Sequence, residues 1–279
     1  MVQFKGNYMK KFAVVGNPIN HSLSPFIHNY FAKNLKINLT YEKFLVESTS
    51  FKDKIFQLRE MYDGLNITLP YKQSIVEISD TKSKEVELTG SANTIIINKT
   101  SIRAENTDGY GLVADLNDHG FNFQDSKILL LGAGGAANGV IYQILKQKPY
   151  RLYLFNRTIE KSHNMRSKWL NENINDVSIE IYNRLLNQDI DLIINATSSS
   201  INSDASPIDL KGFKKQSLCY DMMYGKETPF IKAAKENDLN YLDGIGMLIH
   251  QAAESFRIWN QKKVTSELIA ELKKAISDI

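Results

Sequence analysis

The sequence predicts an α/β protein with two domains, on three observations. Apolar strand-like segments alternate with amphipathic helix-like segments along the whole chain, a pattern typical of mostly parallel sheets covered by helices. The chain has 279 residues, enough for two domains that each bury a core. Near its middle, the sequence KILLLGAGGAANGV places a glycine-rich turn between a strand-like and a helix-like segment, which indicates a second α/β unit.

The first part of the chain holds the elements of one unit. Its expected strands are Phe12–Val15, about Tyr41–Val46, Gly64–Thr68, Asn93–Ile97 and a short strand near Ile102. Its expected helices are Pro25 to about Lys33, about Phe51–Met61 and a stretch that begins near Tyr71. Proline suits the first position of a helix at Pro25, whereas Pro70 interrupts the chain after a strand.

A connecting helix, Tyr110–Leu116, is expected to end at Gly120 and to link the domains. The strands expected after it are Ile128–Leu131, the RLYLF segment before Asn156, Ile190–Asn195 and Ser217–Tyr220. The helices expected near the end are about Pro229–Asn237, a segment in which Met247, Ala252, Phe256 and Trp259 recur at helical spacing, and Thr265–Ile276.

The composition excludes several classes of protein. Hydrophobic residues make up 43% and charged residues 23%, and the formal net charge is +3, so neither a disordered chain nor a fibre is indicated. The lysines are scattered, which argues against a nucleic-acid partner. No apolar run approaches the roughly 18 residues of a membrane span, and no secretory signal pattern is present. The single cysteine, Cys219, fits a reducing compartment, and the dispersed histidines predict no metal site. We expect a cytoplasmic protein.

The glycine-rich segment predicts a Rossmann-type dinucleotide site. Gly132 permits a tight turn, Gly134 lets the backbone approach a pyrophosphate, and Ala137 lets the helix pack close to the strand. The following helix N-terminus offers free N–H groups and partial positive charge to the phosphates. Glycine clusters also form ordinary turns, so the next strand is needed to decide.

That next strand ends in Asn156, Arg157 and Thr158, where an NAD site would usually carry an acidic side chain. An acid would bind the ribose 2′-hydroxyl and repel a 2′-phosphate, whereas Arg157 is able to pair with that phosphate. Lys161 either adds a second cation or is simply solvated. The sequence therefore favours NADP over NAD.

Polar side chains follow several of the expected strands. Ser22 and Ser24 lie just before a helix, and Asn66 and Thr68 end a strand, with Lys72 shortly after them. The carboxyl edge of a parallel sheet is the usual location of ligand sites in open α/β folds. Alternatively, Ser24 caps the helix, Ser22 is solvated and Lys72 is a surface cation.

Two further segments, SANTI and ENTDGYG, place Asn93 and Asp108 at strand ends. Asparagine and aspartate are also routine turn residues. Polar groups from separate strand ends nevertheless meet at one edge of a parallel sheet, which random turns would not achieve. We therefore expect these side chains to share one pocket.

The motifs resemble those of the shikimate dehydrogenase family, whose members use NADP in aromatic amino-acid (chorismate) biosynthesis. The resemblance runs nearly end to end and rests on HSLSP at 21–25, NITLPYK at 66–72, SANT at 91–94, NTDGYG at 106–111, GAGGAA at 132–137, NRT at 156–158, NATS at 195–198 and DGIGMLIHQAA at 243–253. It implies reversible reduction of 3-dehydroshikimate to shikimate with NADPH.

The resemblance also implies a division of labour along the chain. Residues 1–107 and 247–279 would form the substrate domain, to which the final helices return, and residues 108–246 the Rossmann-type NADP domain. Lys72 and Asp108 would form the catalytic pair. The substrate would be bound by Ser22, Ser24, Asn66, Thr68, Lys72, Asn93, Asp108, Tyr224 and Gln251. The cofactor would be bound by Gly132, Ala133, Gly134, Gly135, Ala136, Asn156, Arg157, Thr158, Lys161, Thr197, Met222, Gly244 and Met247. A homodimer is also expected.

The residue types agree with that chemistry. Reducing a ring ketone leaves charge on its oxygen, which an ammonium at Lys72 is able to stabilise and protonate. Asp108 would hold that ammonium in place. Asn66, Asn93 and Gln251 offer paired donors and acceptors for a diol.

Some positions depart from the family pattern, and two alternatives remain. Asn138 replaces a frequent arginine, Glu105 is unusual before NTDG, and Ser199, Ser200 and Ile201 intervene after NATS. One alternative is a quinate/shikimate dehydrogenase that uses NAD or NADP. The other, from a different class, is a non-catalytic dinucleotide sensor on the same fold, against which the presence of both Lys72 and Asp108 argues.

Overall fold

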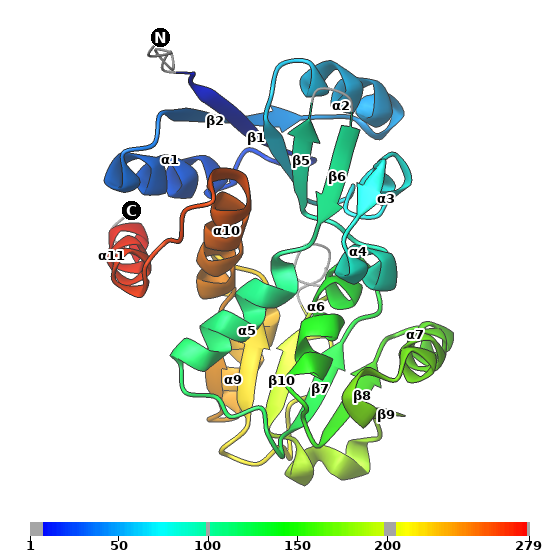
Figure 1. Ribbon diagram of the computed structural model, residues 1–279. Coiled ribbons are helices and arrows are strands. Elements are labelled where there is room, and N and C mark those ends of the chain that lie inside the picture. Colours follow the sequence, from blue (N-terminus) through cyan, green and yellow to red (C-terminus); the bar gives the residue numbers. More distant parts are fainter. Residues whose placement is uncertain (1–7, 99–100, 198–204, 278–279) are drawn as a thin grey trace. The chain divides into compact units, whose positions relative to one another are not determined.

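The computed structural model describes residues 8–98, 101–197 and 205–277. Its contacts divide the chain into two units, each built on its own six-stranded sheet (Figure 1). The first unit comprises Met1–Gly111 and Leu248–Ile279, and the second comprises Leu112–Met247. Ser199, Ser200 and Ile201, where the sequence departs from the family pattern, lie outside the described residues.

The sheet of the first unit mixes parallel and antiparallel pairs. Its strands, in spatial order, are β2 (Leu39–Leu45), β1 (Lys10–Gly16), β3 (Gly64–Ile67), β5 (Thr94–Asn98), β6 (Ser101–Glu105) and β4 (Thr81–Lys82). β1 is parallel to both β2 and β3, and β4 is parallel to β6. β5 runs antiparallel to both β3 and β6. The start of β5 therefore lies at the same edge as the ends of β3 and β6.

Alternate residues of β1 build the two faces of this sheet, as the two-residue period of a strand requires. Ala13 and Val15 pack into a core with Ile55 and Leu58 of α2 (Phe51–Arg59). Phe12 and Val14 face the opposite side, where they pack with Tyr41 and Trp259. Burial on both faces fixes the register, because a one-residue slip would exchange the two sets.

The last helices of the chain return to the first unit, where α11 (Ser266–Ser277) contacts α1 (Ser24–Leu35). Trp259, near the end of α10 (Ile245–Asn260), stacks on Phe12 with ring centroids 4.5 Å apart. Its indole N–H donates to the carbonyl of Ile95 at 2.9 Å. These contacts attach α10 directly to the sheet.

The segment after β3 differs from the helical stretch expected near Tyr71. Residues 70–73 form a turn, and α3 covers only Ser74–Glu77. The Ser79 hydroxyl donates back to the carbonyl of Ile75 at 2.7 Å, just beyond this helix. The short β4 and the helix α4 (Lys84–Thr89), capped by Ser83, follow instead.

The second unit has an all-parallel sheet, as expected for a nucleotide-binding fold. Its strands, in spatial order, are β12 (Asn240–Leu242), β11 (Leu218–Asp221), β10 (Leu192–Asn195), β7 (Lys127–Leu131), β8 (Arg151–Phe155) and β9 (Ser178–Ile181). Every pair is parallel. The two edge strands, β9 and β12, were not predicted; they have only four and three residues and bury few side chains.

Helices connect the strands of this second sheet. They include α6 (Gly135–Lys146) after β7, α7 (Ile159–Glu172) after β8 and α9 (Pro229–Glu236) after β11 (Figure 1). The helix α5 (Asp108–Asp118) leads into the unit and α10 leads out of it. Across the described ranges, none of the helices combines the length and the apolar character needed to cross a membrane.

Candidate active site

Lys72 and Asp108 form an ion pair in the first unit, with Nζ 2.6 Å from Oδ2. Both side chains are mostly buried, with 15% and 6% of their surface exposed. The carboxylate sits in the first turn of α5, where the helix dipole favours negative charge. The Asn106 side chain accepts from the backbone N–H of Asp108 at 2.9 Å, which fixes this turn.

The direction of β5 explains why these residues meet. Asn66 lies in β3 and Lys72 in the turn after it, whereas Asn93 precedes β5 and Asp108 follows β6. Because β5 is antiparallel to both neighbours, all four residues come to the same edge of the sheet. The expected convergence holds, although Asn93 stands at the beginning of its strand rather than at a carboxyl end.

Asn93 is the centre of a buried hydrogen-bond network. Its Nδ2 donates to Asp108 Oδ1 at 2.8 Å and to Gln251 Oε1 at 3.1 Å. Its Oδ1 accepts from the backbone N–H of Thr107 at 2.8 Å. Asp108 is therefore held on both oxygens, by Lys72 on one and by Asn93 on the other.

Asn66 is equally constrained. Tyr41 donates its hydroxyl proton to Asn66 Oδ1 at 2.6 Å, while Asn66 Nδ2 donates to the carbonyl of Asn93 at 3.0 Å. Thr94 and Ser255 also accept from Nδ2, both at 3.2 Å. The amide groups expected to bind a ligand are thus already oriented by protein contacts, and a ligand hydroxyl would join or replace one of these bonds.

Sequence reasoning missed the hydroxyl groups behind these amides. Thr94, Thr107 and Ser255 lie within hydrogen-bond distance of one another, with 2.7 Å between the Thr94 and Ser255 oxygens. Ser255 also donates to the carbonyl of Gln251, four residues earlier in α10. A serine one helical turn after a predicted ligand residue, within an apolar stripe, was the signal available in the sequence.

Of the remaining predicted substrate residues, Ser22, Ser24 and Thr68 belong to the first unit and Tyr224 belongs to the second. Ser24 is the first residue of α1 and does not cap it, so the capping interpretation was wrong; the Ser22 hydroxyl instead accepts from the Ser24 N–H at 3.3 Å. Thr68 follows β3, and its methyl group approaches Gly16.

A buried histidine supports this network from behind. His28 stacks on Tyr41 with centroids 4.3 Å apart and an interplanar angle of 5°. Among the described residues, neither of its ring nitrogens makes a well-aligned hydrogen bond, although Asn66 lies close enough to raise the pKa slightly. Burial lowers the pKa of His28 from 6.5 to about 3, so the ring is neutral at physiological pH.

We expect His28 to make the protein less stable as the pH falls. Between pH 6.5 and about 3 the unfolded histidine binds a proton that the folded one does not, so the free energy of unfolding declines as the pH drops through this window. The limiting slope is about 1.4 kcal/mol per pH unit. Urea unfolding at several pH values should show a flatter profile for His28→Phe than for the exposed-site control His163→Gln. Equal slopes for the two variants would contradict this origin.

In the second unit, the glycine-rich turn has the backbone that the sequence predicts. Gly132 has φ of 108°, a left-handed conformation that suits glycine. Gly134 precedes α6, and a Cβ built there would meet no atom within 4 Å. Ala137 is fully buried, which allows α6 to lie close to β7.

The residues expected to bind the 2′-phosphate lie after β8 and in the first turn of α7. Arg157, Thr158 and Lys161 are all exposed, and Thr158 precedes the first turn of α7. The Asn156 side chain donates to the carbonyl of Thr158 at 2.9 Å, which fixes the turn. Asn138 donates back to the carbonyl of Gly134 at 3.0 Å.

Two buried residues that sequence reasoning missed support the rest of the predicted cofactor site. The Asn195 carboxamide oxygen accepts from both the N–H and the hydroxyl of Thr197, at 3.1 and 2.7 Å. Its Nδ2 donates to Asp221 at 3.3 Å, and burial raises the pKa of that carboxyl. Gly244 packs against Met222, whose carbonyl oxygen would lie 2.3 Å from a Cβ at position 244.

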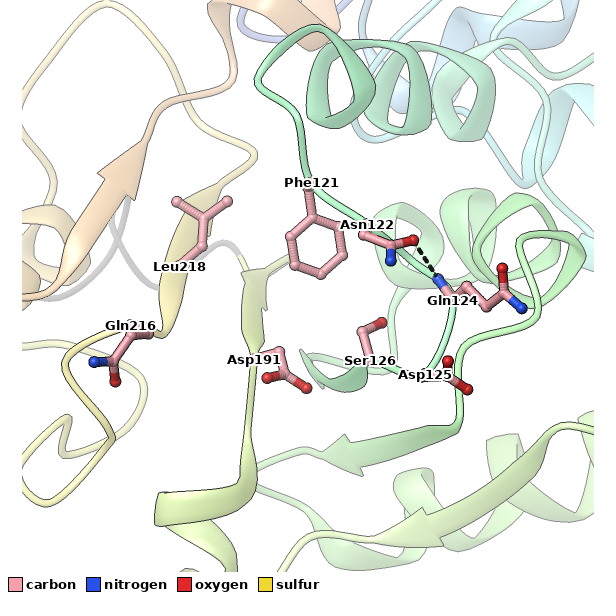
Figure 2. Close-up of a pocket in the computed structure, with 8 residues that line it drawn as sticks. All are labelled: Phe121, Asn122, Gln124, Asp125, Ser126, Asp191, Gln216 and Leu218. Carbon is pink, nitrogen blue, oxygen red and sulfur yellow. Dashed lines mark hydrogen bonds between the residues drawn. The ribbon is translucent and has the colours of Figure 1, made fainter.

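A hollow of about 270 Å³ in the second unit lies elsewhere (Figure 2). Its lining includes Phe121, Ser126, Asp191 and Leu218, near the amino ends of β7, β10 and β11. Ligands of open α/β sheets bind at the opposite, carboxyl ends. Asp191 is also occupied, since it pairs with Lys214 and accepts from the backbone of Lys127 at 2.7 Å. Within the described residues, no group of three or more acidic, His or Cys side chains is placed to hold a metal.

Family models match most of the chain. A shikimate dehydrogenase substrate-binding domain matches residues 14–95, a shikimate/quinate 5-dehydrogenase domain matches residues 115–205, and a shikimate 5′-dehydrogenase C-terminal domain matches residues 244–269. A shikimate dehydrogenase (NADP(+)) of Legionella pneumophila is 39% identical over 266 residues, which cover 94% of this chain and 98% of the relative.

Solved structures agree. A shikimate dehydrogenase from Aquifex aeolicus superposes with a TM-score of 0.85 at 29% identity, over 94% of this chain and 97% of that one. A shikimate 5-dehydrogenase from Thermus thermophilus, in complex with NADP(H) and shikimate, has a TM-score of 0.84 at 26% identity, over 94% and 98% of the two chains. On this identity and coverage, the chain belongs to the shikimate dehydrogenase family.

Proposed function

We propose that this protein catalyses the reversible, NADPH-dependent reduction of 3-dehydroshikimate to shikimate. The observation that carries the proposal is the largely buried Lys72–Asp108 pair, with Nζ 2.6 Å from Oδ2, at an edge of the sheet lined by carboxamides. Relatives named shikimate dehydrogenase (NADP(+)) support both the substrate and the cofactor. The presence of this pair argues against a non-catalytic sensor.

The second unit fits NADP. The open space beside Gly134 leaves room for a pyrophosphate against the N-terminus of α6, a helix of 12 residues. Arg157 and Lys161 offer cations, and no acidic side chain stands among Asn156, Arg157 and Thr158 to repel a 2′-phosphate. When bound, NADPH supplies the hydride that reduces the ketone carbon.

Residues of the first unit supply the proton that the reduction of the ketone requires. The Lys72 ammonium donates to the oxygen that becomes the new hydroxyl, and it stabilises the negative charge that develops there. Asp108 keeps the ammonium in place, and Asn93 keeps Asp108 in place through the bond of 2.8 Å. In the reverse direction the Lys72 amine receives the proton of the shikimate hydroxyl.

Substrate recognition falls to the polar groups around this pair. Asn66, Asn93 and Gln251 offer amide groups that suit a diol, and Ser22 and Ser24 offer hydroxyls that suit a carboxylate. An analogue that lacked a hydroxyl would leave a buried polar group unpaired, so the site should discriminate against it.

The proposal includes a role for each part of the chain. The substrate domain, predicted as residues 1–107 and 247–279, binds the substrate. The nucleotide domain, predicted as residues 108–246, binds NADP. A cytoplasmic location and a homodimer belong to the proposal and rest on the sequence expectations; size-exclusion chromatography measures the second.

The direct test is an assay of purified protein with shikimate and NADP⁺ by nicotinamide absorbance. We expect kcat/KM with NADP⁺ to exceed that with NAD⁺ by at least about tenfold, the effect of one charge-assisted pair. The same assay with quinate in place of shikimate tests the alternative, a quinate/shikimate dehydrogenase. Equal efficiency with both nucleotides would overturn the NADP assignment, and no turnover with any pair would overturn the proposed activity.

A further inference from the structure

The Asn66 carboxamide is held at both ends, and two of the residues that hold it, Tyr41 and Ser255, were not expected to contact the substrate. On one side, Tyr41 donates to Oδ1 at 2.6 Å. On the other, Nδ2 donates to Ser255 Oγ at 3.2 Å and to the carbonyl of Asn93 at 3.0 Å. Asn66 itself is 5% exposed, so water competes little for these bonds.

The hydroxyl of Tyr41 determines the orientation of the Asn66 carboxamide, that is, on which side its oxygen and its NH₂ group lie. Burial raises the pKa of this hydroxyl well above the ordinary value, so the proton stays on the oxygen and is available to Asn66. The ring is fixed by the stacked, neutral His28. A flipped carboxamide would turn its NH₂ group toward this donor and its oxygen toward the Asn93 carbonyl, where two acceptors would face each other.

Ser255 completes the arrangement from α10. Its hydroxyl proton is directed at the Gln251 carbonyl, 3.0 Å away, so its oxygen is left to accept from Asn66. The same oxygen lies 2.7 Å from Thr94 Oγ1. Ser255 is fully buried. It therefore ties the amide of Asn66 to the helical turn that carries Gln251.

We propose that Tyr41 and Ser255 are positioning residues that hold the Asn66 carboxamide in one orientation and thereby set the affinity for the substrate hydroxyl that Asn66 binds. This inference rests on the proposed function, in which Asn66 contacts shikimate. A preoriented amide spends no binding free energy on selecting a rotamer or breaking a competing bond, whereas a loosened one does.

The test is to replace each residue by its nearest analogue without the hydroxyl, Tyr41→Phe and Ser255→Ala. Each change removes one neutral hydrogen bond to Asn66, so we expect the KM for shikimate to rise about five- to tenfold. Both kcat and the KM for NADP⁺ should stay within about twofold, because neither residue touches Lys72, Asp108 or the nucleotide unit. A general loss of structure would lower kcat as well.

A double-mutant cycle with Asn66→Ala separates positioning from a structural role. In the Asn66→Ala background there is no carboxamide to orient, so adding Tyr41→Phe or Ser255→Ala should lower kcat/KM for shikimate by much less than it does in the wild-type protein. Additive losses in both backgrounds would overturn the proposal, because they would show that the two hydroxyls act independently of Asn66.

The chain offers a matched control for each variant. Ser79 is a buried serine that makes the same bond to a carbonyl four residues earlier, that of Ile75, but has no contact with the amides. Tyr62 donates its hydroxyl to Glu42 outside the network. Ser79→Ala and Tyr62→Phe should leave the KM for shikimate unchanged.

The outcomes are distinct. Wild-type protein that does not oxidise shikimate would overturn the proposed function. Active wild-type protein with an unchanged KM in the variants would overturn the positioning roles alone. If Tyr41→Phe does not fold, Ser255→Ala decides the question, since it removes a single oxygen from a helix and raises helix propensity.

Discussion

Replacing Lys72 with alanine should lower kcat by about 10²- to 10⁴-fold, the usual contribution of a positioned general acid or base. The variant loses both the proton donor and the charge that stabilises the developing oxyanion. Because this contribution appears in the transition state, the affinity for shikimate should stay within a few-fold. Steady-state kinetics and a binding titration with shikimate measure the two quantities separately.

Folding must be checked in the same experiment. Removing Lys72 leaves the buried side chain of Asp108, which is 6% exposed, without its cation, and an uncompensated buried charge destabilises a protein. Lys72→Met retains the aliphatic stem and serves as a second variant. Lys82→Ala removes an exposed lysine from β4 of the same unit and should retain full turnover. Near-normal kcat in a folded Lys72→Ala protein would rule out the catalytic role.

Replacing Gly64 with alanine should reduce the free energy of unfolding by about 2–3 kcal/mol, the upper range for an overpacked core. A Cβ at this position would lie 2.5 Å from the Trp259 indole nitrogen and 2.7 Å from the Ile95 carbonyl oxygen. The indole cannot move away without losing its hydrogen bond to Ile95 and its stacking on Phe12. The methyl group therefore displaces α10 from the sheet.

The chain has two tryptophans, Trp169 and Trp259, so a Trp169→Phe background makes fluorescence report on Trp259 alone. In urea, Gly64→Ala should unfold at lower concentration and with a changed native emission. Gly134→Ala is the matched control, since its Cβ meets no atom within 4 Å; it should unfold as the parent does while weakening NADP⁺ binding. An unaltered unfolding curve for Gly64→Ala would show that the sheet accommodates the methyl group.

The periodicity of the sequence predicted most elements, because strands and helices leave their periods in the apolar residues. It failed for short elements, in which too few residues follow the period of a helix or a strand. The expected helix near Tyr71 was reduced to Ser74–Glu77. The edge strand Ser178–Ile181 was missed because its alternation of polar and apolar residues lasts only four residues, of which only Ile179 is buried.

The sequence predicted the main polar residues of the candidate site but not the contacts that position them. Asn66 and Asp108 could be identified from the sequence because they are polar residues that lie near the ends of apolar, strand-like segments. The antiparallel direction of β5 could not, because it follows from pairing with β3 and β6. Tyr41 and Ser255 occupy core-facing positions, and their contacts with Asn66 span 25 and 189 residues of sequence. No local pattern reports such pairings.

The first unit draws on both ends of the chain, which gives the site an order of completion during synthesis. The second unit is continuous from Leu112 to Met247, so it is synthesised in full before residues 248–279 are. Until those residues emerge, Gly64 lacks the indole that covers it, and Asn66 and Asn93 lack their partners Ser255 and Gln251. Domains fold as their sequences become available. The first unit, with its candidate active site, is therefore completed only after the whole second unit has been synthesised.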